Sequence, residues 1–226
     1  MDFRHEWKHQ INTSDVITLE NRLSIVMQPD PHAVDGIYHI HSLYFDDLYN
    51  KAFHEKEDGM SIREKFRIRY YNENTDFIKL EKKTKVDNLS NKIACPISRS
   101  QVESILSGNY QDILSAGDKT PPLMRELYMN LTSALLKPKV LIDYRRKPFI
   151  YPYGNIRVTI DYDVQTSLEI NDFLIPSHHM LPIAEDIILL EVKWDEYLPD
   201  VIKSAVWLPG RQKSSFSKYS SGRIYG

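Results

Sequence analysis

Charged residues recur at every second position in two neighbouring segments of the sequence. Residues 62–71 read IREKFRIRYY and residues 77–85 read FIKLEKKTK. Successive side chains of a strand point to opposite faces, so each segment predicts a strand with one ionic face and one mostly apolar face. The short polar link 72–76 predicts the hairpin loop between them. The ionic positions include Arg67, Arg69, Glu81 and Lys83.

The same alternation recurs in other segments. Strands are expected over residues 3–10, 37–46, 89–96, 140–147, 155–161 and 187–195. Their ionic positions include Glu6, Lys8, Lys92, Arg157, Asp161, Glu191 and Lys193. Residues two positions apart on one face of a strand are separated by roughly 7 Å. At an effective dielectric of about 20, like charges at that distance repel by about 2 kcal/mol.

Two arrangements of these ionic faces are open at this point. Antiparallel sheets commonly keep one polar face in water, where salt screens most of the repulsion. A sheet closed into a barrel around its ionic faces would not be screened in this way. Because the bases on these faces outnumber the acids, a closed barrel would need an anion inside, and a polyanion suits it best.

The carboxylates Glu6, Glu81, Asp161 and Glu191 lie among these bases and have two open roles. They could simply pair with neighbouring cations. In a phosphate site they could instead hold Mg²⁺ or Mn²⁺, which take oxygen ligands and bridge phosphate oxygens.

Other motifs for phosphate or metal chemistry are absent from the sequence. It contains neither a P-loop nor a kinase glycine-rich loop, and its eight histidines include no HExxH spacing. His178 and His179 fall in an expected loop over residues 177–182, where solvation is the simpler expectation. Cys95 is the single cysteine, so no disulfide can form within the chain.

Length and charge limit the class of protein. The chain has 226 residues and a formal net charge of −2, which gives no signal of attraction to nucleic acid or membrane. No apolar run of about 18 residues and no apolar signal core occurs. No linker divides the sequence, so one domain over residues 1–226 and a cytoplasmic location are expected.

Helical patterns interrupt the strands. Helices are expected over residues 13–26, 47–57, 98–107, 121–137, 199–206 and 214–221. Thr13 or Ser14 is the expected cap of the first, and Ser98 with Gln101 has the spacing of a capping box in the third. Proline suits the first turn of the fourth, whose apolar stripe runs from Leu123 to Leu135.

Seven short motifs along the chain resemble those of a known family. They are Glu6-x-Lys8, Tyr44-Phe45-Asp46, Arg67-x-Arg69, Glu81-x-Lys83, Arg157-Val-Thr-Ile-Asp161, Glu191-Val-Lys193 and Ser217-Lys218-Tyr219. In this order they resemble the triphosphate tunnel metalloenzymes, and above all the vacuolar transporter chaperone (VTC) catalytic domain, whose bacterial relatives are polyphosphate polymerase domains. The resemblance implies an α+β fold: a closed antiparallel β-barrel of about eight strands, with helices packed outside.

The resemblance also implies roles for individual residues. The catalytic bases would be Lys8, Arg67, Arg69, Lys83, Arg157 and Lys193. Further substrate contacts would come from Lys92, Arg145 or Arg146, Ser217 and Lys218. Glu191 would be the principal metal ligand, with Glu6, Glu81 and Asp161 beside it. Two positions depart from related patterns: Arg4 replaces the first acid of ExExK, and Ser215 replaces a base.

The choice between Arg145 and Arg146 is open. Parity groups Arg145 with Asp143 and Lys147 as one ionic face, whereas the family's Tyr-x-Arg pattern selects Arg146. We follow the family pattern here, because a β-bulge could shift the register.

The function implied is transfer of the γ-phosphoryl group of ATP to a growing polyphosphate chain, with Mn²⁺ or Mg²⁺ as cofactor. ATP, triphosphate and polyphosphate would be the partners, with no nucleic acid. Two alternatives are a metal-dependent tripolyphosphatase and a non-catalytic module that binds polyphosphate or inositol phosphates. The oligomeric state and a membrane protein that exports the product are left open.

Overall fold

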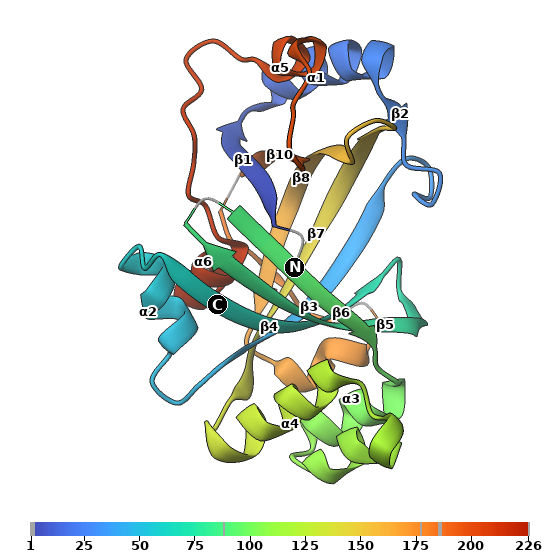
Figure 1. Cartoon of the computed structure of the whole chain (residues 1–226), viewed down its shortest axis with the longest axis vertical. Helices are drawn as coiled ribbons and strands as arrows, with labels where there is room; N and C mark the ends of the chain where they lie inside the picture. The colour runs from blue at the N-terminus through green and yellow to red at the C-terminus, as the bar shows by residue number, and fades with distance from the viewer. Residues whose placement is uncertain (1–2, 88, 177, 185–186, 226) are drawn as a thin grey trace.

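The computed structural model describes residues 3–87, 89–176, 178–184 and 187–225, and antiparallel strands form its centre (Figure 1). The strand order is β2-β7-β3-β4-β5-β6-β1-β10-β8-β9, and a further pairing of β7 with β8 closes eight of these strands into a barrel. The predicted closed antiparallel barrel is therefore confirmed. The strands are β1 (Arg4–Ile11), β2 (Gln28–Pro29), β3 (Tyr38–Asp46), β4 (Ile62–Tyr71), β5 (Asn74–Val86), β6 (Leu89–Pro96), β7 (Lys137–Tyr151), β8 (Ile156–Ser167), β9 (Leu181–Pro182) and β10 (Ile188–Trp194).

Helices pack against the apolar outer face of this barrel. The α-helices are α1 (Thr13–Val26), α2 (Lys51–Glu57), α3 (Arg99–Leu106), α4 (Pro122–Ser133), α5 (Asp200–Val206) and α6 (Lys218–Tyr225), and short 3₁₀ helices are η1 (Tyr110–Leu114), η2 (Gly117–Lys119) and η3 (Ile170–Leu174). Figure 1 shows α1 and α5 at one end of the molecule and α3 and α4 at the other. Leu19 of α1 packs with Val158 and Val192 in one buried cluster, and Leu127 of α4 packs with Ile68 in another.

Helix α6 differs from the others because it packs on side chains that face into the barrel. The backbone oxygen of Gly222 accepts a hydrogen bond from Thr166 Oγ1 of β8 at 3.2 Å. Tyr219 donates its hydroxyl proton to the buried carboxylate of Asp46. The same carboxylate accepts from the backbone N–H of Ala52 at 2.8 Å, so it joins α6 to the start of α2. Helix α6 is therefore the helix seated closest to the inward-facing side chains, and the predicted barrel with packed helices holds.

Several element boundaries differ from those expected. The β4–β5 hairpin turns through only two residues, Asn72 and Glu73, with φ of 52° and 57°, which is the geometry of a type I′ turn rather than a five-residue loop. Asn12, rather than Thr13 or Ser14, caps α1. Its side chain accepts from the backbone N–H of Asp15, and the Asp15 carboxylate accepts from the backbone N–H of Asn12. Leu135 lies beyond the end of α4 and is exposed.

Two further differences concern the last third of the chain. The final helix begins at Lys218 rather than at residue 214. Residues 181–182 form β9 within the expected loop 177–182, whose first residue lies outside the described range.

The capping box of Ser98 and Gln101 is confirmed at α3. One domain over residues 1–226 stays a prediction. Among the described helices, none combines the length and apolar character needed to cross a bilayer.

The close packing of α6 gives a first prediction. Gly222→Ala would place its new methyl group against Ile142 Cδ1, at a distance that real side chains do not adopt, and 3.0 Å from Thr166 Oγ1, which is a tight contact. We expect the substitution to lower the free energy of unfolding by about 1–3 kcal/mol, the usual cost of overpacking a core. Chemical denaturation measures this, and Ser221→Ala on the same helix is the matched control. Equal stability of both variants would show that α6 is not seated as described.

Candidate functional site

The ionic faces of separate strands meet inside the barrel. Lys83 of β5 contacts Glu6 of β1 at 3.0 Å, although β6 lies between these strands in the sheet. Arg69 of β4 donates to the hydroxyl of Tyr144 on β7 at 3.0 Å, across the intervening β3. Contacts between strands that are not neighbours require the side chains to point inward, because an open sheet would keep them apart.

Glu81 is the centre of one group of ion pairs. Its Oε2 atom accepts from Arg67 Nε at 2.7 Å and lies 4.0 Å from Arg69 Nη1, while its Oε1 atom accepts from Lys92 Nζ at 2.8 Å. Burial alone would raise the pKa of Glu81, but the two guanidinium groups and Lys92 hold it well below its usual range. Arg69 also donates to Ser42 Oγ at 3.1 Å. Glu81 is therefore a fixed anion that orients three bases.

Glu6 and Glu191 form a second group and share their cations. Lys8 Nζ lies 3.7 Å from Glu6 and 3.2 Å from Glu191, and Lys193 contacts both carboxylates. Burial opposes ionisation of Glu6, but Lys8, Lys83 and Lys193 outweigh it and lower its pKa to about 2. The pKa of Glu191 is likewise lowered well below its usual value, mainly by Lys193 and Lys8 acting against burial. Both carboxylates are thus ionised.

Asp161 anchors a third group. Arg146 binds it through two hydrogen bonds, of 2.7 and 2.8 Å, and Lys218 of α6 approaches it at 2.6 Å. These two cations overcome the effect of burial and lower the pKa of Asp161 to about 2. The ring of Tyr144 lies beneath both cations, 4.5 Å from Lys218 Nζ and 5.4 Å from the Arg146 guanidinium carbon. Arg146 and Lys218 are thereby held in one place on the barrel wall.

Some residues of the site were not found from the sequence. Arg157 Nη2 pairs with Asp30 at 2.9 Å, and Asp30 comes from the connection between β2 and β3. Arg67 Nη1 donates to the Tyr44 hydroxyl oxygen at 3.1 Å, and Arg67 and Arg69 overcome burial to lower the pKa of Tyr44 to about 7. The Tyr44-Phe45-Asp46 motif was a signal for Tyr44. No pattern in the sequence pointed to Asp30.

Positive charge exceeds negative charge within this site, which we call the inner site. Its described cations are Lys8, Lys65, Arg67, Arg69, Lys83, Lys92, Arg146, Arg157, Lys193 and Lys218, and its described carboxylates are Glu6, Asp30, Glu81, Asp161 and Glu191. The carboxylates are at most 8% exposed, whereas Lys83 and Lys193 keep 29% and 27% of their side chains exposed. The acids therefore lie against the wall, and the surplus cations remain reachable by a solute.

Unused hydrogen-bonding atoms also remain in the inner site. Arg157 Nε and Thr159 Oγ1 are buried without a partner among the described residues. Lys65 contacts only Ser217 Oγ, at 3.4 Å, and the ring of Tyr219, and has no carboxylate partner in the described part of the chain. Donors without acceptors, together with surplus positive charge, are suited to an anion with several oxygen atoms.

The four carboxylates expected to ligate a metal are not gathered at one point. Glu6 and Glu191 lie side by side and offer hard oxygen donors, whereas Glu81 and Asp161 each belong to a separate group of cations. Among the described residues, these acids do not form a set of three donors close enough to hold one ion. Glu191 and Glu6, which share Lys8 and Lys193, are the two carboxylates that would hold a Mg²⁺ or Mn²⁺ ion.

The structure places Arg145 and Arg146 on opposite faces of the barrel wall and corrects the expectation for His178. Arg145 lies outside the barrel, 57% exposed and 3.6 Å from Asp163, whereas Arg146 points inward. Parity correctly grouped Arg145 with Asp143 and Lys147, but this ionic face is the outer one, and the bulge lies on β8 at Asp163. His178, expected in solvent, has a side chain only 3% exposed.

A protein family and several solved structures are similar to this chain. A family model described as VTC domain matches residues 3–225. No curated protein matches the chain. Solved structures with similar shape include a protein of Pyrococcus horikoshii OT3, with 11% identity, a TM-score of 0.48 and coverage of 97% of this chain and 94% of that one. A conserved hypothetical protein of Pyrococcus furiosus has 12% identity, a TM-score of 0.45 and coverage of 90% and 86%.

The mimivirus capping enzyme triphosphatase also has 12% identity, with a TM-score of 0.44 and coverage of 90% of this chain and 86% of that one. Likenesses of this size identify no activity. The family match, in contrast, spans nearly the whole chain.

Adjacent arginines on opposite faces give a matched pair of variants. Arg146→Ala removes a cation of the inner site, whereas Arg145→Ala removes one on the outer surface. Tripolyphosphate should raise the melting temperature of the wild type and of Arg145→Ala, because it binds the folded state and relieves repulsion. The shift should be much smaller for Arg146→Ala. Equal shifts in both variants would place the anion elsewhere.

The lowered pKa values of two lysines predict a pH dependence. Burial lowers the pKa of Lys83 to about 7, with Lys8 and Lys193 adding to the effect and Glu6 opposing it, and burial lowers that of Lys65 to about 8. Between these values and the ordinary 10.5, the unfolded state binds more protons, so the protein without ligand should become more stable as pH rises. A bound polyanion favours charged Lys83, so its stabilising effect should shrink over the same range.

Thermal melts with and without tripolyphosphate, from about pH 6.5 to about pH 9, measure both trends. Lys83→Met should weaken both pH trends, because methionine has no proton to lose. A ligand effect that is constant with pH, or that Lys83→Met leaves unchanged, would contradict the assignment.

Proposed function

This chain belongs to the VTC domain family, and on that premise we propose that it is a polyphosphate polymerase. It would transfer the γ-phosphoryl group of ATP to the end of a growing polyphosphate chain and release ADP. The observation that carries the proposal is the inner site, in which reachable cations exceed the ionised acids. A condensed phosphate carries charge at regular intervals and suits a series of bases spread along several strands.

Charge neutralisation is the main requirement of phosphoryl transfer. The transferred group passes through a loose transition state, in which charge is spread over its outer oxygens. Lys8 keeps its proton, because Glu6 and Glu191 raise its pKa against the effect of burial. Arg67 and Arg69 are held in fixed orientations by Glu81, Ser42 and Tyr144, so they need not reorganise when charge develops.

Acceptor and donor must also lie in line. Arg146 and Lys218 hold one part of the wall through Asp161, while Lys193, Lys8 and Lys83 hold another through Glu6 and Glu191. Two separate groups of bases can position two phosphate groups at once, which intermolecular transfer requires. Glu191 and Glu6 would hold a Mn²⁺ or Mg²⁺ ion, which would neutralise further charge on the phosphate groups.

The product of the reaction separates this function from its alternatives. Purified protein with ATP and Mn²⁺ should yield a ladder of polyphosphate on a gel, with ADP released in proportion to the phosphate incorporated. Release of inorganic phosphate from tripolyphosphate without polymer would instead identify a tripolyphosphatase. Neither product, with tripolyphosphate still bound, would identify a binding module and overturn the proposal.

A variant at the principal acid, Glu191, tests whether turnover depends on the inner site. Glu191→Gln keeps the shape of the side chain but removes its charge, so turnover should fall by about 100-fold or more. Binding of tripolyphosphate, measured by the shift in melting temperature, should persist. Glu103→Gln on α3, which is remote from the inner site, should leave turnover unchanged.

A further inference from the structure

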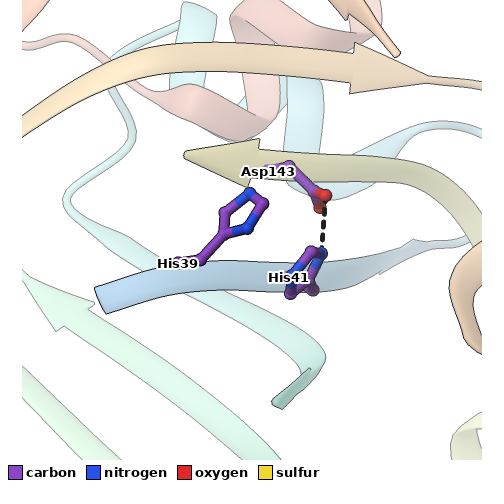
Figure 2. Close-up of side chains that lie close together, drawn as sticks. All are labelled: His39, His41 and Asp143. Atoms are coloured by element: carbon purple, nitrogen blue, oxygen red, sulfur yellow. Dashed lines mark hydrogen bonds and ion pairs between the residues drawn. The ribbon is translucent and has the colours of Figure 1, made fainter. Parts of the chain in front are cut away.

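A second group of polar side chains lies on the outer face of the barrel wall. His39 and His41 of β3 and Asp143 of β7 come together there, as Figure 2 shows. Each offers one nitrogen or carboxylate oxygen, and these atoms lie within 4.8 Å of one another. His178, from the segment after η3, adds its Nε2 atom 3.7 Å from Asp143 Oδ2. We call these four residues the outer cluster.

The hydrogen bond of His178 fixes the proton on its ring. Its Nδ1 atom lies 2.9 Å from the backbone oxygen of Ile175, which can only accept, so Nδ1 must carry a proton. In the neutral ring, Nε2 then has a free lone pair, and it faces a carboxylate oxygen that is also an acceptor. Two acceptors facing each other need a cation or a proton between them. A ring nitrogen with its partner N–H bound to a carbonyl is also the usual form of a metal ligand.

His41 and Asp143 leave further atoms without partners. His41 Nδ1 lies 2.6 Å from Asp143 Oδ2, and both residues are buried, at 5% and 4% exposure. His41 Nε2, Asp143 Oδ1 and His178 Nε2 are three of the seven buried side-chain atoms without a hydrogen-bond partner in the described part of the chain. Tyr70 stacks on the His41 ring at 4.5 Å and fixes its orientation.

A single proton does not account for this group. A proton added to either histidine would be directed to Asp143 Oδ2 and would still leave Asp143 Oδ1 and a nitrogen of the other histidine without partners. A divalent cation beside Asp143 could accept lone pairs from a carboxylate oxygen and from one ring nitrogen of each neighbouring histidine. Imidazole and carboxylate together suit Zn²⁺ and similar ions, whereas Mg²⁺ prefers oxygen donors only.

We propose that His39, His41, Asp143 and His178 form a binding site for a Zn²⁺-class transition-metal ion, separate from the inner site. Tetrahedral zinc with bonds of about 2.0–2.1 Å needs donor atoms roughly 3.3 Å apart. The ligand atoms of His39, His41 and Asp143 lie within 4.8 Å of one another, and His178 Nε2 lies 3.7 Å from Asp143 Oδ2, so the side chains would draw together when the ion binds. The ion would tie β3, β7 and the segment that holds His178 together on the outer face.

The two sites use opposite faces of the same strands. On β3, Ser42 and Tyr44 point inward to Arg69 and Arg67, while His39 and His41 point outward. On β7, Tyr144 points inward to Arg69, while Asp143 points outward to His41. An ion in the outer cluster therefore contacts no residue of the inner site.

Direct binding of Zn²⁺ and Co²⁺, each as the metal alone, tests the proposal. The wild type should retain a single equivalent of Zn²⁺ after dialysis, and Co²⁺ should give the visible absorption of a tetrahedral nitrogen and oxygen site. His178→Gln and Asp143→Asn should weaken Zn²⁺ binding by at least about tenfold. The exposed neighbour supplies the control: His179→Gln should bind as the wild type does.

Glu191→Gln separates the two sites, because it alters the inner site only. It should retain the Zn²⁺ equivalent and the Co²⁺ spectrum. Absence of binding by the wild type, equal binding by His178→Gln and His179→Gln, or loss of binding in Glu191→Gln would each overturn the proposal. Circular dichroism without metal checks folding, and if Asp143→Asn does not fold, His178→Gln decides, since it lies outside the barrel strands.

Discussion

Mutual repulsion among the cations enclosed by the barrel is the constraint on which the inner site depends. Closure through the β7–β8 pairing brings the ionic faces of separate strands toward one interior. Each strand alone would place its charges in water at little cost. Once closed, the barrel must compensate them, and it does so with buried carboxylates at Glu6, Glu81, Asp161 and Glu191. Compensation is incomplete, which leaves the interior suited to an anion.

The carboxylates also give direction to the bases. An arginine or lysine with no partner samples many rotamers, and binding would have to order it. Here Arg67, Arg146 and Lys218 are each bonded to an acid before any ligand arrives. Orientation is therefore built into the fold at a cost in stability, since burying these ions in pairs is seldom favourable compared with apolar packing. Such an arrangement is typical of sites that must bind charge without reorganising.

Alternation along the strands made much of the fold and the inner site predictable. A strand period of two, repeated in separate segments, was enough to indicate ionic faces, and the motifs implied that they face inward. The same rule did not give the side of Arg145, because the ionic face of Asp143, Arg145 and Lys147 points outward, where Lys147 pairs with Glu20 of α1. Periodicity shows that a face is ionic, but the partners that decide its side come from distant elements.

Other features could not be inferred for the same reason. Asp30 reaches Arg157 from a connection that has no pattern of its own, and the burial of His178 depends on where η3 leaves the following segment. The two-residue turn at Asn72 and Glu73 required left-handed conformations of both residues, which the sequence permits but does not dictate.

Side chains alternate between the two faces of β3 and β7, so the same backbone carries the inner site and the outer cluster. The two sites are linked through that backbone and not through contacts between their side chains. His41 pairs with Asp143 in the backbone ladder, and the adjacent pair is Ser42 with Ile142. A shift in this ladder that moved His41 away from Asp143 would move Ser42 and Tyr144 as well, and both are partners of Arg69. Whatever fixes the outer contacts therefore helps to fix the position of an inner arginine, because the two faces of a strand share one backbone.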